Sequence, residues 1–180
     1  MKKVFGILLV LVSLVSFPSW AETKADLVKR GDLYFKKFSD VPFSGEVQGQ
    51  WQGYFLDGKK EGEWTTYHDN GQLESKGFYK DGRENSDWIF YFDNGQKATE
   101  LAYELGKKTG YFIGFYPNGS QQICGSYLND KIDGYVYFYD NNRNLNLEAT
   151  GIYSKGKKVA ELELSVFDSV FENCPTPPSQ

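Results

Sequence analysis

The side chains with the spacing for acid–base chemistry in this 180-residue chain are carboxylates two positions apart. Glu61 and Glu63 form one pair, and Glu161 and Glu163 form another. Alternate residues of a β-strand face the same side, so each pair could supply the two carboxylates of a glycoside hydrolase. That chemistry also needs a walled cleft, and paired carboxylates are common on any solvated strand. We therefore expect these residues to be surface groups.

Nucleophilic and metal-assisted catalysis have even fewer candidate residues. His68 is the only histidine, so a two-histidine site is impossible and a catalytic triad would depend on this residue alone. The two cysteines lack the close spacing of zinc ligands, and no glycine-rich phosphate loop precedes a helical pattern. We predict that the protein is not an enzyme and that it holds no cofactor and no metal.

The first residues predict export from the cytoplasm. Lys2 and Lys3 precede an apolar run over residues 4–17, and the small residues Ser19 and Ala21 fit cleavage after Ala21. An uncleaved anchor is the alternative, but the run is shorter than the roughly 20 residues of a membrane-spanning helix. We predict a signal peptide over residues 1–21 and a periplasmic or secreted mature chain without a membrane span.

The mature chain is acidic. Cleavage after Ala21 would remove two lysines and no acids, leaving 18 basic and 24 acidic side chains and a formal charge of −6. Nucleic acids and anionic lipid surfaces attract concentrated positive charge, so this balance disfavours both as partners.

The cysteines, Cys124 and Cys174, have a structural use in an oxidising compartment. A disulfide between them would tie the C-terminal stretch CPTPPSQ to the rest of the chain. Two unrelated thiols are the alternative, because the sequence does not give the distance between the two Cα atoms.

A repeat of 24 residues positions most of the aromatic side chains. Each unit has an asparagine in a turn, an aromatic residue three positions earlier and a large apolar residue three positions before that. The asparagines are Asn70, Asn94, Asn118 and Asn142. The aromatic residues are Tyr67, Tyr91, Phe115 and Tyr139, and the apolar residues are Trp64, Trp88, Phe112 and Val136. A second turn falls at Gly58-Lys59, Gly82-Arg83, Gly106-Lys107 and Asp130-Lys131.

Each unit is predicted to form one β-hairpin. Asn-Gly between two aromatic-rich runs predicts a two-residue type I′ turn, which needs a positive φ at both central positions. The runs between turns are rich in β-branched and aromatic residues and lack helical periodicity, as strands of five or six residues do. Arg143 replaces the glycine of the fourth unit, so we expect a longer loop there. Stacked hairpins would bury one another's aromatic residues in an all-β, elongated, twisted antiparallel sheet.

The same pattern divides the mature chain into three parts. Residues 22–52 form an N-terminal cap with an entry hairpin that turns near Asp40 to Pro42, and residues 53–158 form the repeats. Residues 159–180 form a closing strand and a Pro-rich tail. Both ends of a repeat array need atypical caps to protect the open edges of the sheet.

The unit G-x-W-x-x-Y-x-x-N-G, followed by an aromatic residue and DGK, resembles the bacterial variant of the MORN repeat over roughly residues 27–158. The resemblance implies a twisted sheet of hairpins, a scaffolding role and, in some members, lipid contact. Many such proteins are labelled antitoxin components, which act in the cytoplasm. An exported chain would instead play an immunity-like role against a toxin met in the envelope.

The aromatic columns are the candidate binding site. They either pack across strands or stack on a partner, and tyrosine suits a half-exposed interface. We predict a non-catalytic protein-interaction module of the bacterial envelope, whose partner-binding candidates are Tyr67, Tyr91, Phe115, Tyr139, Trp64 and Trp88. The alternative is carbohydrate or cell-wall binding, because WIFYFDNGQKAT is similar to glucan- and choline-binding repeats.

Overall fold

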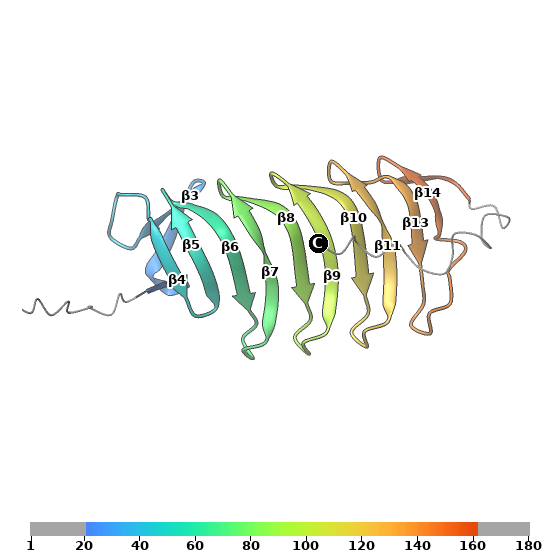
Figure 1. Ribbon diagram of the computed structural model, residues 1–180, viewed down its shortest axis with the longest axis horizontal. Helices are drawn as coiled ribbons and strands as arrows, with labels where there is room; N and C mark the ends of the chain where they lie inside the picture. The colour runs from blue at the N-terminus through green and yellow to red at the C-terminus, as the bar shows by residue number, and fades with distance from the viewer. Residues whose placement is uncertain (1–20, 162–180) are drawn as a thin grey trace, which may run out of the picture.

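A long sheet of consecutive hairpins makes up most of the computed structural model, which describes residues 21–161 (Figure 1). Neighbouring strands are antiparallel except for β1 and β4. Within the described residues the sheet has 13 strands. In spatial order they are β1 (Glu22–Thr23), β4 (Gly45–Gln48), β5 (Trp51–Leu56), β6 (Lys59–Tyr67), β7 (Leu73–Lys80), β8 (Arg83–Tyr91), β9 (Lys97–Glu104), β10 (Lys107–Phe115), β11 (Gln121–Leu128), β13 (Gly134–Phe138), β14 (Gly151–Ser154) and β15 (Lys157–Ala160), with β12 (Lys131–Ile132) beside β11. The all-β hairpin architecture predicted from the sequence is confirmed.

A separate hairpin covers the N-terminal end of the sheet. A 3-10 turn (Lys24–Asp26) leads into β2 (Leu27–Arg30) and β3 (Leu33–Lys36), which pair with each other. The predicted turn near Asp40 to Pro42 is therefore not the turn of the regular hairpin. The chain does reverse there, but a single bridge between Phe35 and Pro42 closes that loop.

The core of this end is one apolar cluster. Tyr34 of the cap packs against a group of buried side chains from the cap and the first strands of the sheet. The buried members are Leu27, Phe43, Val47, Phe55 and Trp64. The cap thus shields apolar surface that the first hairpin of an open sheet would otherwise expose.

The Asn-Gly turns differ from the predicted type. In the first unit the His68 N–H donates to the Gln72 carbonyl (2.8 Å) and the Gly71 N–H donates to the His68 carbonyl (2.9 Å). Gly71 has a φ of 82°, but Asn70 is not in the left-handed region, so the turn is not type I′. Instead, the Asn70 Oδ1 accepts the Gln72 N–H at 3.0 Å. The asparagine therefore serves as a side-chain acceptor.

The second turns have the I′ geometry. Asp57 and Gly58 have φ angles of 49° and 79°, which match the two central positions of that turn. The equivalent pairs also have positive φ angles, and they are Asp81-Gly82, Leu105-Gly106, Asn129-Asp130 and Lys155-Gly156. The feature predicted for one end of each hairpin is thus found at the other end.

Arg143 occupies a left-handed position. The fourth unit has the longer connection expected, residues 139–150, but its first part keeps the tight loop of the other units. The Asp140 N–H donates to the Asn144 carbonyl (2.8 Å), and the Arg143 N–H donates to the Asp140 carbonyl (2.9 Å). Arg143 has a φ of 68°, so the longer connection does not relieve the strain expected for a residue with a Cβ.

Hydrogen bonds also join the turns of successive units. The Asn70 Nδ2 donates to the Asp93 carbonyl at 2.6 Å, and the Asn94 Nδ2 donates to the Pro117 carbonyl at 2.8 Å. Asn70 and Asn94 therefore each bond within their own turn through Oδ1 and to the next turn through Nδ2. These two bonds give the asparagine a role that glycine cannot perform.

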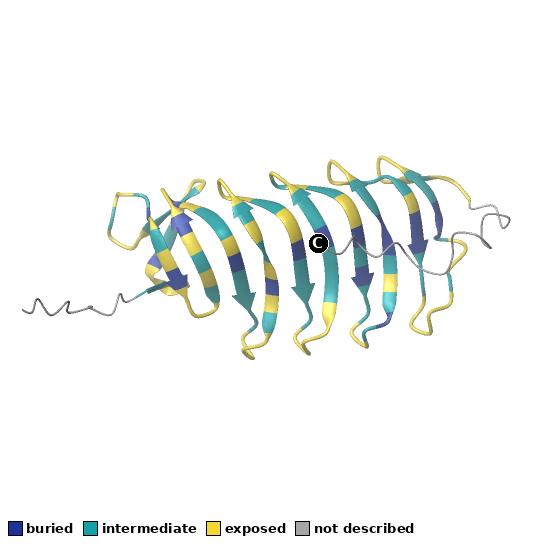
Figure 2. Cartoon of the chain, in the orientation of Figure 1, coloured by how far each residue is buried: buried dark blue, intermediate teal, exposed yellow. Residues whose placement is uncertain are grey.

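The core of the repeats lies in a band across the middle of the strands (Figure 2). Each tryptophan ring fills the space above a glycine of a neighbouring strand. A Cβ added at Gly77 would lie 2.1 Å from the Trp88 ring, and one at Gly53 would lie 2.6 Å from the Trp64 ring. In the third unit Leu101 replaces the glycine and pairs with Phe112. The larger aliphatic residue thus occurs beside the smaller ring.

Candidate interaction surface

The two predicted tryptophans are packing residues. Trp64 is 1% exposed and Trp88 is 3% exposed. Each indole Nε1 donates to a backbone carbonyl at 3.2 Å, that of Tyr54 or Phe78. Their prediction as partner-binding residues is corrected, because their rings have almost no surface to offer. We call the face that carries these rings the inner face of the sheet.

The predicted tyrosine column forms, but it is half-buried. Tyr67, Tyr91 and Phe115 lie at strand ends, each next to a shift in strand register, and Tyr139 follows β13. Burial raises the pKa of Tyr139. These four residues keep partial exposure and remain candidates for a contact.

A more exposed set of aromatic residues lies on the opposite, outer face. Tyr54, Phe78, Tyr111 and Tyr135 are 43%, 38%, 48% and 52% exposed, respectively. Each is adjacent in its strand to a residue of the inner face, so its side chain points the other way. Strand pairing places Glu63 opposite Phe78 and Tyr111 opposite Ser126. Between these pairs the register is irregular, since Tyr54 is opposite Glu61 and Phe78 is opposite Asn85, so the four residues follow a stepped line across the sheet.

We call this line the outer row. It consists of Tyr54, Glu63, Phe78, Asp87, Ala102, Tyr111, Ser126, Tyr135 and Ile152. The outer row was not predicted from the sequence. A usable signal was the residue before each core apolar residue, which changes from acidic in the first two units to tyrosine in the last two. Counting alternate residues from Trp64 would have placed that position on the outer face.

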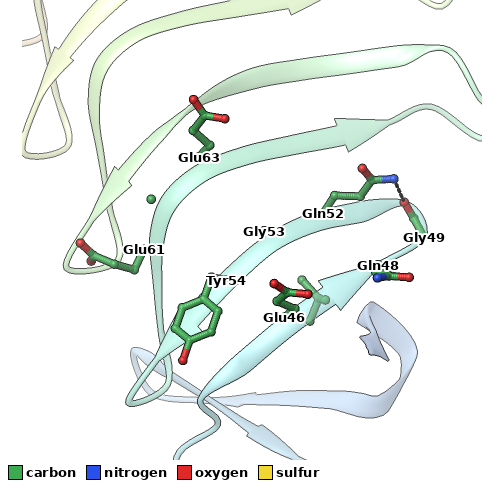
Figure 3. Close-up of a pocket in the computed structure, with 10 residues that line it drawn as sticks. Glu46, Gln48, Gly49, Gln52, Gly53, Tyr54, Glu61 and Glu63 are labelled. Carbon is green, nitrogen blue, oxygen red and sulfur yellow. Dashed lines mark hydrogen bonds between the residues drawn. The ribbon is translucent and has the colours of Figure 1, made fainter. Parts of the chain in front are cut away.

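The outer face is acidic at its N-terminal end. Glu46, Glu61 and Glu63 line an open hollow of about 500 Å³ together with Tyr54 (Figure 3). Glu61 accepts the Asp81 N–H at 2.8 Å, which gives it a structural role in the following turn. Figure 3 shows the carboxylates of Glu61 and Glu63 directed to different parts of the hollow. Glu163 of the other pair lies outside the described residues.

The hairpin of β6 and β7 matches a known repeat. The family model for the MORN repeat variant matches residues 60–81, which cover most of β6 and all of β7 up to the next turn. This protein carries a MORN repeat of the variant type. The hairpins of β8 with β9 and β10 with β11 reproduce the matched MORN hairpin 24 and 48 residues later. A search of curated proteins found no match.

His68 has a structural contact in the MORN array. Its Nε2 lies 3.0 Å from the Tyr91 carbonyl of the next unit, and the Tyr116 hydroxyl makes the equivalent bond to the Tyr139 carbonyl. Across residues 21–161, no group of three or more His, Cys, Asp or Glu side chains is placed to hold a metal ion. In the same part of the chain, no helix has the length and apolarity to cross a membrane.

The inner face holds an unusual lysine at the N-terminal end of the array. The Lys60 Nζ lies 4.3 Å from the Trp64 ring, 4.6 Å from Trp51 and 4.7 Å from Tyr79. Burial lowers the pKa of Lys60 to about 8, although Glu84 acts in the opposite direction. Contacts with the three aromatic rings offset part of the free energy needed to bury the charged ammonium, so the Lys60 ammonium is a component of the core.

Cys124 is buried in β11 and belongs to a disulfide. Cys174, the other cysteine of the chain, lies outside the described residues, as do the predicted signal peptide up to residue 20 and the closing strand after Glu161. The pairing of Cys124 with Cys174 stays a prediction.

Proposed function

We propose that this MORN-variant protein is a non-catalytic interaction module of the bacterial envelope that binds a partner protein along the outer row. The observation that carries the proposal is the line of four exposed aromatic residues on one face. Tyrosine and phenylalanine are enriched where proteins meet, because they supply a large apolar area with few rotatable bonds.

The size of the row supports a protein partner. From β5 to β14 the row crosses eight strand spacings of about 4.8 Å, which gives a length of roughly 38 Å. A specific interface buries about 800 Å² on each partner, and a strip of this length with the side chains that flank it can supply that area. The array therefore suits an extended surface or a strand-like segment of another protein.

The charge of the row suggests the chemistry of the partner. Glu63 is opposite Phe78 in the N-terminal half of the row, and Asp87 is opposite Ala102. Glu63 also lines the hollow together with Glu46 and Glu61. Complementary charge accelerates association and orients the two proteins. We infer a partner with basic side chains that face the first two units and apolar side chains that face the last two.

The predicted signal peptide supports an encounter in the envelope. An immunity-like role, in which the partner is a toxin met outside the cytoplasm, fits both the export signal and the acidic row. The first part of this proposal is tested by sequencing the mature N-terminus from a periplasmic fraction, where we expect the chain to start at Glu22. A cytoplasmic chain that still begins at Met1 would contradict it.

The interaction is tested by photo-crosslinking in the native host. A crosslinking amino acid at Tyr111 or Tyr135 should capture one protein in near-equal amount, whereas one at the buried position Trp88 should capture none. The double variant Tyr111→Ala/Tyr135→Ala should lose the partner while its circular dichroism spectrum is unchanged. The matched double variant Tyr91→Ala/Phe115→Ala tests the half-buried column in the same way.

Two results would overturn the proposal. The first is unchanged partner recovery by the outer-row variant together with loss of recovery by the variant of the half-buried column. The second is cosedimentation of the protein with purified cell wall and no captured protein, which would favour carbohydrate binding.

A further inference from the structure

Lys60 lies in an aromatic enclosure on the inner face that the repeat itself does not require. Its Nζ faces Trp51 of β5, Trp64 of β6 and Tyr79 of β7, at 4.3 to 4.7 Å from the ring centroids. We call these three rings the lysine enclosure. Lys108 occupies the same position two units later and lies 5.3 Å from a tyrosine ring. Both positions thus place a lysine near a tyrosine, and the first unit adds two tryptophans.

A hollow adjoins Lys60 where the cap meets the sheet. Its volume is about 180 Å³, and its walls include Tyr34 of the cap and Tyr79 of the sheet. The charged residues that line it are Lys29, Asp32, Lys59, Lys60 and Glu84. The Tyr79 hydroxyl donates to Glu84 Oε1 at 3.5 Å. A single water needs only about 10–15 Å³ of such space, so the hollow has room for a small molecule of several heavy atoms.

The surroundings of Lys60 favour its uncharged amine. Burial lowers the pKa of Lys60 to about 8; Glu84 acts in the opposite direction, and the ammonium groups of Lys24 and Lys29 lower the pKa further. Lys24 lies over the Trp51 ring at 4.6 Å, the same ring that Lys60 contacts. Near pH 7 the uncharged fraction is then roughly 200-fold larger than for an ordinary lysine, whose pKa is about 10.4. The uncharged amine is the form that attacks a carbonyl carbon.

We propose that Lys60 is a covalent binding site for small aldehydes: its Nζ condenses with an aldehyde that enters the hollow, and the lysine enclosure holds the imine that forms. The geometry supplies the two requirements of such a site, which are a nucleophile and a space beside it for a small molecule. The site lies on the inner face and the outer row on the opposite face, so the inference does not depend on the proposed function.

The condensation needs no oxidant or reductant. The Nζ lone pair forms a bond to the carbonyl carbon, and a proton moves from the nitrogen to the carbonyl oxygen to give a carbinolamine. The hydroxyl group then takes up a second proton and leaves as water, while the nitrogen lone pair forms the carbon–nitrogen double bond. One aldehyde and one proton are consumed and one water is released for each protonated imine. Tyr79 and Glu84 line the same hollow and supply groups that can transfer these protons.

The lysine enclosure suits the product as well as the free amine. A protonated imine carries the same positive charge as the ammonium that it replaces, so the faces of the three rings attract it in the same way. The charge of Glu84, which favours the ammonium form of Lys60, favours the protonated imine for the same reason. The enclosure therefore stabilises the bound state without a change in the packing of the rings.

The test is reductive trapping of the folded chain with acetaldehyde and sodium cyanoborohydride near pH 7, followed by peptide mapping. Cyanoborohydride reduces the imine to a stable ethylamine. Lys60 should be labelled at least about tenfold faster than Lys108, because its larger uncharged fraction outweighs the slower access to a half-buried amine. In urea, where the enclosure is lost, the two lysines should be labelled at the same rate.

Two matched variants check the assignment by intact mass. Lys60→Met should remove the fast adduct, and Lys108→Met, at the equivalent position, should keep it. Three results would each overturn the proposal: equal labelling of Lys60 and Lys108 in the folded chain, a preference for Lys60 that persists in urea, or a fast adduct that survives Lys60→Met. The first two results come from the unmodified chain, so they decide the matter even if Lys60→Met fails to fold.

Discussion

Replacing Arg143 with glycine should stabilise the protein. Arg143 has a φ of 68° in the loop where the first three units have glycine. A left-handed conformation costs a residue with a Cβ about 1–2 kcal/mol. Glycine returns about 0.5–1 kcal/mol of this through its greater freedom in the unfolded chain. We therefore expect Arg143→Gly to raise the free energy of unfolding by about 0.5–1 kcal/mol, or the melting temperature by roughly 1–4 °C.

Two variants separate the backbone effect from loss of the arginine side chain. Arg143→Ala keeps the strained φ and should give no gain. Gly71→Arg creates the same strain in the first unit, where a Cβ would meet no atom within 4 Å, so its net cost of about 0.5–1 kcal/mol comes from the backbone alone. Urea unfolding followed by tryptophan fluorescence and circular dichroism gives all three values.

The effect should also be local. Stability in a repeat array is close to a sum of unit and interface contributions, so Arg143→Gly should slow amide hydrogen exchange in β13 and β14 more than in β6 and β7. If Arg143→Gly leaves the urea midpoint unchanged or lowers it while Gly71→Arg is also neutral, the argument from positive φ is refuted.

Three further predictions concern other positions. Gly77→Leu should lower the free energy of unfolding by about 1–3 kcal/mol through overpacking against the Trp88 ring. The double variant Gly77→Leu/Trp88→Phe, which reproduces the third unit, should recover most of that loss in a double-mutant cycle. The free energy of unfolding should rise as the pH increases from about 8 to 9.5, because the unfolded chain keeps the Lys60 proton that the folded chain loses near its pKa of about 8. Urea titrations at several pH values should show that Lys60→Met removes this rise and that Lys59→Met does not. Leu105→Asn should raise the melting temperature slightly, because asparagine tolerates the φ of 49° at that I′ position better than leucine does.

The hairpins could be predicted because local residues specify them. The 24-residue period and the aromatic-rich runs fix where strands and turns fall. The turn types were wrong for a specific reason: Asn-Gly favours type I′ in isolation, but the Asn70 side chain accepts the Gln72 N–H and bonds to the following unit. The Leu105-Gly106 turn has the positive φ angles of type I′ although leucine at its first central position is no sequence signal for that turn.

The candidate site was less predictable because it depends on which face of the sheet carries the buried side chains. Trp64 and Trp88 could not be assigned to the core until Gly53 and Gly77 were seen beneath their rings. Tyr111 and Tyr135 have no counterparts in the first two units, where Glu63 and Asp87 stand instead. A search for repeated residues therefore does not detect the outer row, because it finds only the positions that the units share. The residues of the outer row differ from unit to unit.

The asparagine bonds between turns restrict the length of the array to multiples of one repeat. The first three units are joined through the same donor and acceptor, Asn70 to Asp93 and Asn94 to Pro117. The array can therefore change length only in whole units of 24 residues, each of which adds two strands or roughly 9.6 Å. A gain of one unit would move the acidic and aromatic halves of the outer row apart by that step and leave the turns intact. Unit number is thus a means of matching this surface to partners of different length, independently of the side chains that contact them.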